Sequence, residues 1–168
     1  MKNATPRPIQ RSDLTFKNLN EACDEVRHLR EYGYQLAGTW SLAQILDHLN
    51  RSMQMTVDGA DFTFPAILRP IFRLLMMPTL RKGKPSKLRG KAPQPLIPDP
   101  HADEETVAKR FYELAERLMH PDTEFAASYP MLGRLSREEW LLLQRWHIAH
   151  HLSFVVPEVS RTTTTSKH

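Results

Sequence analysis

Residues 136–155 read SREEWLLLQRWHIAHHLSFV, and this stretch decides the fold that we expect for the whole chain. Ser136 is followed three residues later by Glu139, which is the capping-box pattern that opens many helices. Pro157 then marks where a helix must have ended. The spacing therefore predicts a final helix over residues 137–155.

Outward from this helix, three further segments repeat apolar residues at helical spacing, over 13–34, 40–58 and 103–119. The stretch 59–80 is apolar but interrupted by prolines, which favours short helical turns. Residues 82–100 are rich in Pro, Gly and Lys, so we expect a long surface loop with few core contacts. The pattern predicts an all-α fold, an antiparallel four-helix bundle with an extra proline-interrupted segment and a long loop between helices 2 and 3. No sheet beyond an isolated bridge is expected.

Composition predicts one soluble domain. The chain has 168 residues, of which 40% are hydrophobic and 25% charged. We expect an extended arm over 1–12, the bundle over 13–157 and a disordered tail over 158–168. Cys23 is the sole cysteine, so an intrachain disulfide and a cysteine-based metal site are excluded, and a passive thiol is expected. No secretory signal pattern is present, and the longest apolar stretch, 64–78, is too short and interrupted for a membrane span. A cytoplasmic protein is therefore expected.

Three histidines on the final helix are the main candidates for a functional site. At 100° per residue, His147 and His151 fall about 40° apart and share their arc with apolar residues such as Trp140 and Leu143. Two histidines four residues apart on one helical face can bind a single metal ion. His150 falls about 60° away on the other side, which leaves a ligand, a second-shell group or a rim residue open. The alternative interpretation is a set of hydrogen-bonded core histidines.

A third ligand is required, because two histidines hold a metal poorly. His48 flanks the apolar stripe of the segment 40–58 and is expected to face a neighbouring helix. His28 is open by the same logic, but Arg27 and Arg30 flank it. The other histidines lie in connectors or in the tail: His101, His120 and His168.

Two motifs carry a resemblance to a known family. A helix start TWS that leads to ILDHLN, within residues 39–50, and HIAHHL on the final helix resemble the DinB/YfiT-like four-helix metalloprotein superfamily. The segment YPMLGRLSREEWLLLQRWHIAHHLSF, residues 129–154, is most similar to its domain of unknown function 1569 family. The resemblance covers roughly 14–155. It departs from the family pattern at Tyr129, where a histidine is usual, and at Ser153–Phe154, where RQF is usual.

The resemblance implies a four-helix bundle with one nickel, zinc or iron ion per chain. One ligand comes from the second helix and two from the last, which correspond here to His48, His147 and His151. Some members of the superfamily transfer low-molecular-weight thiols or isomerise maleylpyruvate. The resemblance therefore implies a small-molecule substrate, and it leaves open a thiol co-substrate and a homodimer.

Three neutral imidazoles leave a divalent ion with its full charge and an open position. Such an ion makes water or a thiol more acidic and so generates a nucleophile, which predicts a metal-dependent hydrolase or thiol transferase. A general base is not evident, because Asp47 points away from His48 on the wheel and Glu138 and Glu139 lie two or more turns from His147. The alternative function is a non-catalytic bundle that binds a metal or a small ligand.

Residues 69–91 carry a concentration of positive charge: Arg69, Arg73, Arg81, Lys82, Lys84, Lys87, Arg89 and Lys91. A basic and apolar segment can bind an anionic membrane or a nucleic acid. We favour a core-packing segment followed by a solvated loop. The stretch has a single aromatic residue, Phe72, which provides little for base stacking, so no nucleic acid partner is expected.

Overall fold

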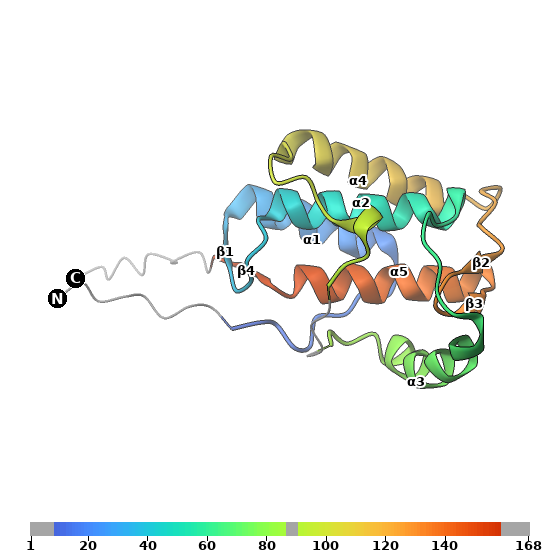
Figure 1. The fold of residues 1–168 in the computed structure, drawn as a ribbon. Helices are drawn as coiled ribbons and strands as arrows, with labels where there is room; N and C mark the ends of the chain where they lie inside the picture. The colour runs from blue at the N-terminus through green and yellow to red at the C-terminus, as the bar shows by residue number, and fades with distance from the viewer. Residues whose placement is uncertain (1–8, 87–90, 159–168) are drawn as a thin grey trace, which may run out of the picture.

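The structure is a computed structural model that describes residues 9–86 and 91–158 (Figure 1). Within these residues the chain is mostly helical, as expected. The helices are α1 (Leu19–Tyr32), α2 (Leu42–Asp58), α3 (Arg69–Lys82), α4 (Glu104–Met119) and α5 (Arg137–Leu152). Two short 3-10 turns, η1 (Ala66–Leu68) and η2 (Gln94–Leu96), flank the region of α3.

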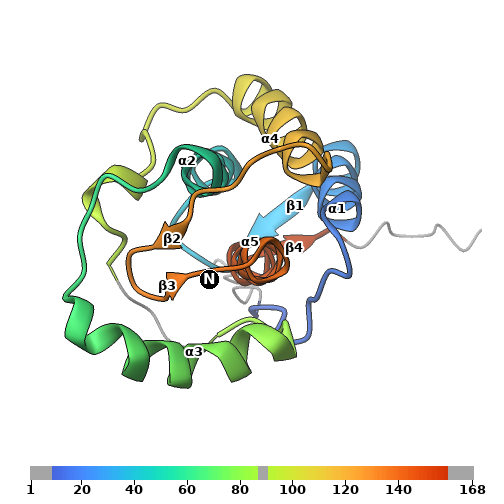
Figure 2. The same cartoon turned by 90° about the vertical axis from the view of Figure 1, so that its right-hand side faces the viewer.

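Four of these helices enclose the main core. Helix α2 packs against α4 and α5, and α1 packs against the same two helices, as the view along their axes in Figure 2 shows. Buried aliphatic and aromatic side chains from all four fill the space between them, for example Leu29, Leu46, Phe111 and Ile148. Cys23 belongs to this core, and burial raises the pKa of its thiol to about 11, which agrees with a passive thiol. The mostly helical fold is confirmed, with a helix in each of the four predicted segments and a fifth helix, α3, in addition.

Local signals set the start of α5 as predicted. The Ser136 hydroxyl accepts the backbone N–H of Glu139, and the Glu139 carboxylate accepts the N–H of Ser136. The helix ends at Leu152, three residues before the predicted end at 155, because the chain turns there to enter a strand.

Helix α1 begins later than predicted. Its first residue is Leu19, and the Asn18 side chain caps it by accepting the N–H of Glu21. The preceding residues are not helical, and Leu14 and Phe16 pack onto the core from them. The prediction that the helix starts at residue 13 was therefore wrong, because apolar contact with the core holds this segment without a helix.

The expectation of no sheet was also wrong. Strand β1 (Tyr34–Leu36) pairs with β4 (Val155–Pro157) in an antiparallel ladder that aligns Gln35 with Val156. Strands β2 (Ser128–Tyr129) and β3 (Gly133–Arg134) form a second antiparallel pair just before α5. Strands of two or three residues are too short to show an alternating pattern in the sequence.

Helix α3 is a full helix of 14 residues, where only short turns were expected. Pro70 lies in its first turn, where the missing N–H has no helical partner to lose. Pro78 lies inside the helix, but both it and Leu74, whose carbonyl it cannot bond, are exposed to solvent. Helix α3 runs crosswise to the other four and outside them (Figures 1 and 2).

The loop 82–100 differs from the prediction at its C-terminal end. Residues 87–90 lie outside the described part of the chain, but Leu96 and Pro98 are buried, and Leu96 contacts the site described below. A short apolar cluster within a polar loop was enough to dock it on α2.

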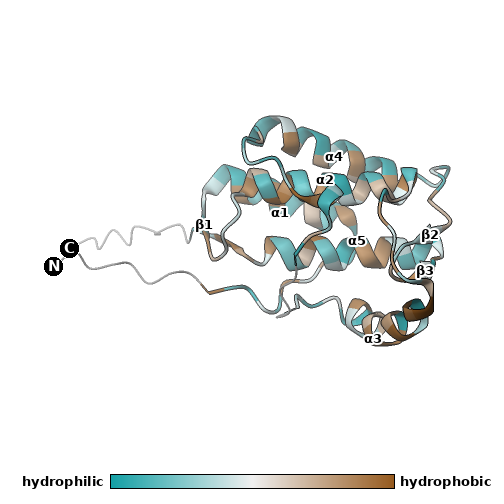
Figure 3. Cartoon of the chain, in the orientation of Figure 1, coloured by the Kyte–Doolittle hydropathy of each residue, from teal (hydrophilic) through white to brown (hydrophobic). Residues whose placement is uncertain are grey.

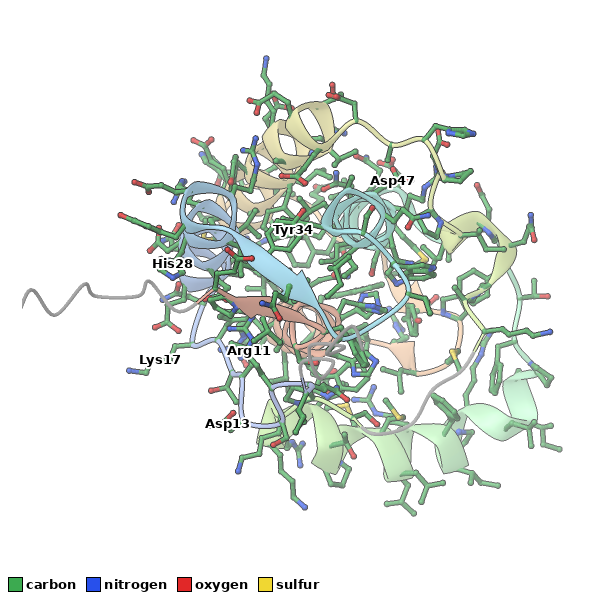
Figure 4. All side chains as sticks on the ribbon, turned by 90° about the vertical axis from the view of Figure 1, so that its left-hand side faces the viewer. Arg11, Asp13, Lys17, His28, Tyr34 and Asp47 are labelled. Atoms are coloured by element: carbon green, nitrogen blue, oxygen red, sulfur yellow. The ribbon has the colours of Figure 1, made fainter. Side chains whose placement is uncertain are left out.

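The N-terminal arm is anchored where the structure describes it. The backbone N–H of Arg11 donates to the Ser153 carbonyl oxygen at 2.9 Å, and its guanidinium pairs with Glu25 of α1 at 2.7 Å. Figure 4 shows Arg11 beside the β1–β4 end of the molecule, where Tyr34 also lies. Residues 1–8 of the predicted arm and 159–168 of the predicted tail lie outside the described residues.

Candidate metal centre

His48, His147 and His151 come together between α2 and α5. Each offers one ring nitrogen, and these three nitrogens lie within 4.8 Å of one another. Two come from adjacent turns of α5, and the third comes from α2, which packs against it. Among the described residues, this is the group of histidine, cysteine and acidic side chains with the spacing to hold a metal ion.

The Leu96 carbonyl oxygen orients His48. It lies 2.6 Å from His48 Nδ1, and a carbonyl can only accept, so Nδ1 carries the proton. The lone pair of His48 is therefore on Nε2, the nitrogen that faces His147. A metal-binding imidazole usually donates its other ring N–H to a carbonyl or a carboxylate in this way.

A buried amide orients His147 in the same way. The Gln144 amide nitrogen donates to the Ser52 carbonyl oxygen at 3.1 Å and to the Thr56 hydroxyl at 2.9 Å. The Gln144 side-chain oxygen lies 3.3 Å from the Ser52 hydroxyl, which donates to it. The Ser52 oxygen is then the acceptor for His147 Nδ1, at 3.0 Å. This chain of hydrogen bonds favours a proton on His147 Nδ1 and a lone pair on its Nε2.

The two Nε2 atoms of His48 and His147 lie 3.0 Å apart. With the protons placed as above, both nitrogens direct lone pairs into the same small space. Two lone pairs at this distance repel each other unless a proton or a cation lies between them. The polar network around the histidines therefore creates a position for positive charge.

Burial keeps these imidazoles neutral. It holds the pKa of His48 below its ordinary value, despite the Leu96 hydrogen bond. It lowers the pKa values of His147 and His151 further, and repulsion within the histidine cluster adds to the effect. A neutral imidazole is the form that binds a metal ion.

Aromatic side chains cover the three histidines. Trp40 stacks on His151 with ring centroids 5.8 Å apart and also contacts His48. A cavity of about 270 Å³ adjoins the site, and all three histidines line it together with apolar side chains. Its other lining residues include Trp146, Phe72, Met76, Leu143 and Tyr129. Burial raises the pKa of Tyr129 to about 12, so its hydroxyl stays protonated.

A second cavity of about 250 Å³, bordered by Trp40 and Phe154, also reaches His151. A third cavity, of about 520 Å³, runs along α2 and α4 and contains none of the three histidines. The two smaller cavities therefore adjoin histidines of the cluster, whereas the cavity of about 520 Å³ does not.

His150 lies to one side of the cluster. Its ring stacks on Trp146 with centroids 5.6 Å apart, and its Nδ1 accepts the backbone N–H of Ser86 at 3.2 Å. It lines both smaller cavities. This placement is that of a rim residue whose Nδ1 is engaged by the loop after α3.

The other sequence candidates lie elsewhere. His28 is exposed on α1, where its ring contacts that of Tyr32 at a tilt of 40°, and Figure 4 shows it on the outer side of that helix. His101 and His120 are exposed. Asp47 faces away from the cluster, where its carboxylate pairs with Arg51 and accepts the N–H of Asp99. His168 lies outside the described residues.

Sequence reasoning missed the residues that orient the histidines. Ser52 and Thr56 follow His48 at four-residue intervals, and Gln144 precedes His147 by three residues. Each helix therefore carries a polar stripe within an apolar face, which is a recognisable signal. No such signal pointed to the Leu96 carbonyl, since any residue could provide that group.

The fold and the site define a mostly helical protein with a buried three-histidine cluster that could hold a metal ion. The family model described as protein of unknown function (DUF1569) matches residues 8–158, and the chain belongs to this family. The DUF1569 family is part of the DinB/YfiT-like superfamily. A search of curated proteins and a search of solved structures each found no match. Among the described residues, no helix has the length and apolar character to cross a bilayer.

Proposed function

We propose that this chain is a DinB-like antiparallel four-helix bundle that binds one divalent metal ion through His48, His147 and His151. In this proposal it is a hydrolase or a thiol transferase that acts on a small molecule. The observation that carries the proposal is the convergence of three histidine ring nitrogens within 4.8 Å of one another, with His48 Nε2 and His147 Nε2 only 3.0 Å apart.

The residues present fit such an ion. Two nitrogens bound to one tetrahedral zinc ion lie about 3.3 Å apart, close to the 3.0 Å between the Nε2 atoms of His48 and His147. The three ring nitrogens are neutral donors of the type that zinc, nickel and iron(II) accept. The Leu96 carbonyl and the Ser52–Gln144 pair supply the outer hydrogen bonds that such ligands need.

When bound, a divalent ion supplies Lewis acidity that makes water or a thiol a stronger nucleophile near neutral pH. The chain's own residues do the rest. Trp40, Trp146 and the apolar side chains of the cavity exclude bulk water and select a small, largely apolar substrate. His150 carries its proton on Nε2 when neutral, because Nδ1 accepts a hydrogen bond. Tyr129 stays protonated. Its hydroxyl borders the cavity and contacts Met131 Sδ at 3.9 Å, and in this proposal it turns to donate a hydrogen bond to a substrate.

A non-catalytic metal-binding or ligand-binding bundle is the second candidate. One observation favours it. Among the described residues that line the cavity, none is an aspartate or a glutamate, so no carboxylate is placed to act as a general base. In this alternative the same three histidines bind the ion, and no substrate is turned over.

The test starts from protein purified without a metal-affinity column. Elemental analysis should find about one nickel, zinc or iron ion per chain, or the chain should bind one on titration. The loaded protein is then assayed for hydrolysis of an activated ester and for transfer of a small thiol to an electrophile. A chain with no affinity for these ions would refute the proposal. Binding without turnover in either assay would favour the second candidate.

Replacing Ser52 with alanine should lower the affinity for zinc by roughly 10–100-fold, the cost that loss of an outer hydrogen-bond partner usually carries. The substitution removes the acceptor that holds the proton on His147 Nδ1. Competition with a chromophoric chelator measures the change. Ser12→Ala, at an exposed position outside the site, is the matched control and should leave the affinity unchanged. An equal affinity in both variants would show that Ser52 does not orient the ligand.

A further inference from the structure

The outer face of α3 and η1 exposes large aliphatic side chains. Five of them are between 45% and 84% exposed: Ile67, Leu68, Ile71, Leu74 and Leu75. Figure 3 shows the apolar colouring of this region, on the helix that lies outside the other four. We call these five residues the α3 outer face. Monomeric soluble proteins rarely expose large contiguous apolar patches, and those they do expose often mark interaction sites.

The body of the protein holds α3 in this orientation. Arg69 Nε donates to the Pro130 carbonyl oxygen at 2.9 Å. The Arg73 guanidinium donates to the Arg134 carbonyl oxygen at 2.9 Å and pairs with Glu139 of α5. Met77 and Leu80 are buried on the same inner side. The polar contacts are therefore on the inside, and turning the apolar side inward would break them.

We expected the apolar part of residues 69–91 to pack in the core, and this holds for only some of its residues. Phe72, Met76, Met77 and Leu80 pack against the small core around Trp140. The α3 outer face does not. Helix α3 thus has two apolar sides. One side packs against the small core, and the other faces solvent.

Charge indicates what kind of surface covers this face. No aspartate or glutamate occurs between Phe62 and Pro98. Arg81, Lys82 and Lys84 follow the aliphatic residues at the C-terminal end of the helix and are exposed. Glu138 and Glu139 at the start of α5 line one pocket together with Arg81 and Met77, and Glu139 also pairs with Arg73. The segment between residues 62 and 98 therefore presents exposed aliphatic groups beside Lys82 and Lys84, and it contains no acidic residue of its own.

We propose that the α3 outer face binds the surface of an anionic lipid bilayer. In this arrangement α3 lies in the plane of the headgroups. Its aliphatic side chains enter the boundary with the acyl chains, and Arg81, Lys82 and Lys84 contact the lipid phosphates. A second copy of the chain is the other occupant to consider. An isologous contact between two such faces would bring together two segments that carry only positive charge, so the charge pattern favours the lipid surface.

Flotation with lipid vesicles tests the proposal on the full chain. The probes are vesicles of phosphatidylcholine alone and of an equal mixture of phosphatidylcholine and phosphatidylserine. Binding is expected to the mixed vesicles only and to weaken as salt is raised, because salt screens the attraction. Leu74→Ser with Leu75→Ser should weaken binding by about tenfold or more through lost apolar contact. Arg81→Gln with Lys82→Gln should weaken it by about thirtyfold.

Matched controls change the same residue types on other faces. Tyr32→Ser removes an exposed hydrophobic residue of α1, and Lys109→Gln with Arg117→Gln removes two exposed cations of α4. Both controls should bind like the unchanged chain. Absence of binding to the mixed vesicles would overturn the proposal. Sedimentation as a dimer that Leu74→Ser with Leu75→Ser disrupts, together with no vesicle binding, would assign the face to a second copy instead.

Discussion

Replacing His147 with alanine should abolish stoichiometric metal binding. His147 is the central residue of the cluster, because its Nε2 lies 3.0 Å from His48 Nε2 and its ring contacts that of His151. Its loss leaves two donors on different helices, and two imidazoles hold a divalent ion poorly. We expect the zinc affinity to fall by more than about 100-fold, beyond the range expected for an outer-shell partner. Isothermal titration with zinc on metal-free protein measures it.

His150→Ala is the comparison that makes this test specific. The two histidines are three residues apart on the same helix, but His150 stacks on Trp146 and accepts a hydrogen bond from Ser86. Its removal should weaken zinc binding less than removal of His147. His28→Ala, at an exposed position on α1, should have no effect. If His147→Ala still bound one ion per chain at the original affinity, the three-histidine assignment would be wrong.

Without metal, the protein should lose stability as the pH falls below the ordinary histidine value of 6.5. Burial lowers the pKa values of His48, His147 and His151 in the folded chain. The unfolded chain therefore binds protons at a pH where the folded chain does not. The stabilising effect of the neutral imidazoles is complete above 6.5 and is lost as the pH falls toward the lowered pKa values. The slope approaches about 1.4 kcal/mol per pH unit for each such proton.

Urea unfolding at several pH values in the presence of a chelator gives this slope. His151→Gln should reduce it, because glutamine removes one titrating group and keeps a polar side chain. His101→Gln changes an exposed histidine of the connector before α4 and should leave the slope as it is. A free energy of unfolding that stays constant from neutral pH to well below 6.5 would contradict burial as the cause of the lowered pKa values.

The starts of two helices could be predicted from short-range sequence patterns. Ser136 and Glu139 mark the start of α5, and Ser41 and Gln44 form the same capping box at the start of α2. Each of these signals involves residues within one helical turn, so the backbone geometry that they favour does not depend on the rest of the chain. The same applies to the His147–His151 pair, because the pitch of the helix brings the two rings together.

The third histidine, His48, could be proposed from the sequence because it flanks an apolar stripe that must be buried. The groups that orient the histidines by hydrogen bonds could not be proposed in this way. The Leu96 carbonyl that orients His48 belongs to a loop, and neither its proline content nor its charge shows where it docks. Likewise, Ser52 and Gln144 are separated by 92 residues. Their hydrogen bond exists only once α2 and α5 have packed.

The sequence by itself therefore determined four of the five helices, most of their ends and the inward direction of the paired histidines. Tertiary structure alone decided the pairing of β1 with β4, the non-helical start of the chain before Leu19 and the side of α3 that faces solvent. The physical reason is the range of the interactions. A helix cap or a helical stripe is stabilised by residues close in the chain. A strand of three residues needs a distant segment to pair its backbone N–H and C=O groups, and the side of α3 that faces solvent depends on the distant groups that bind its other side.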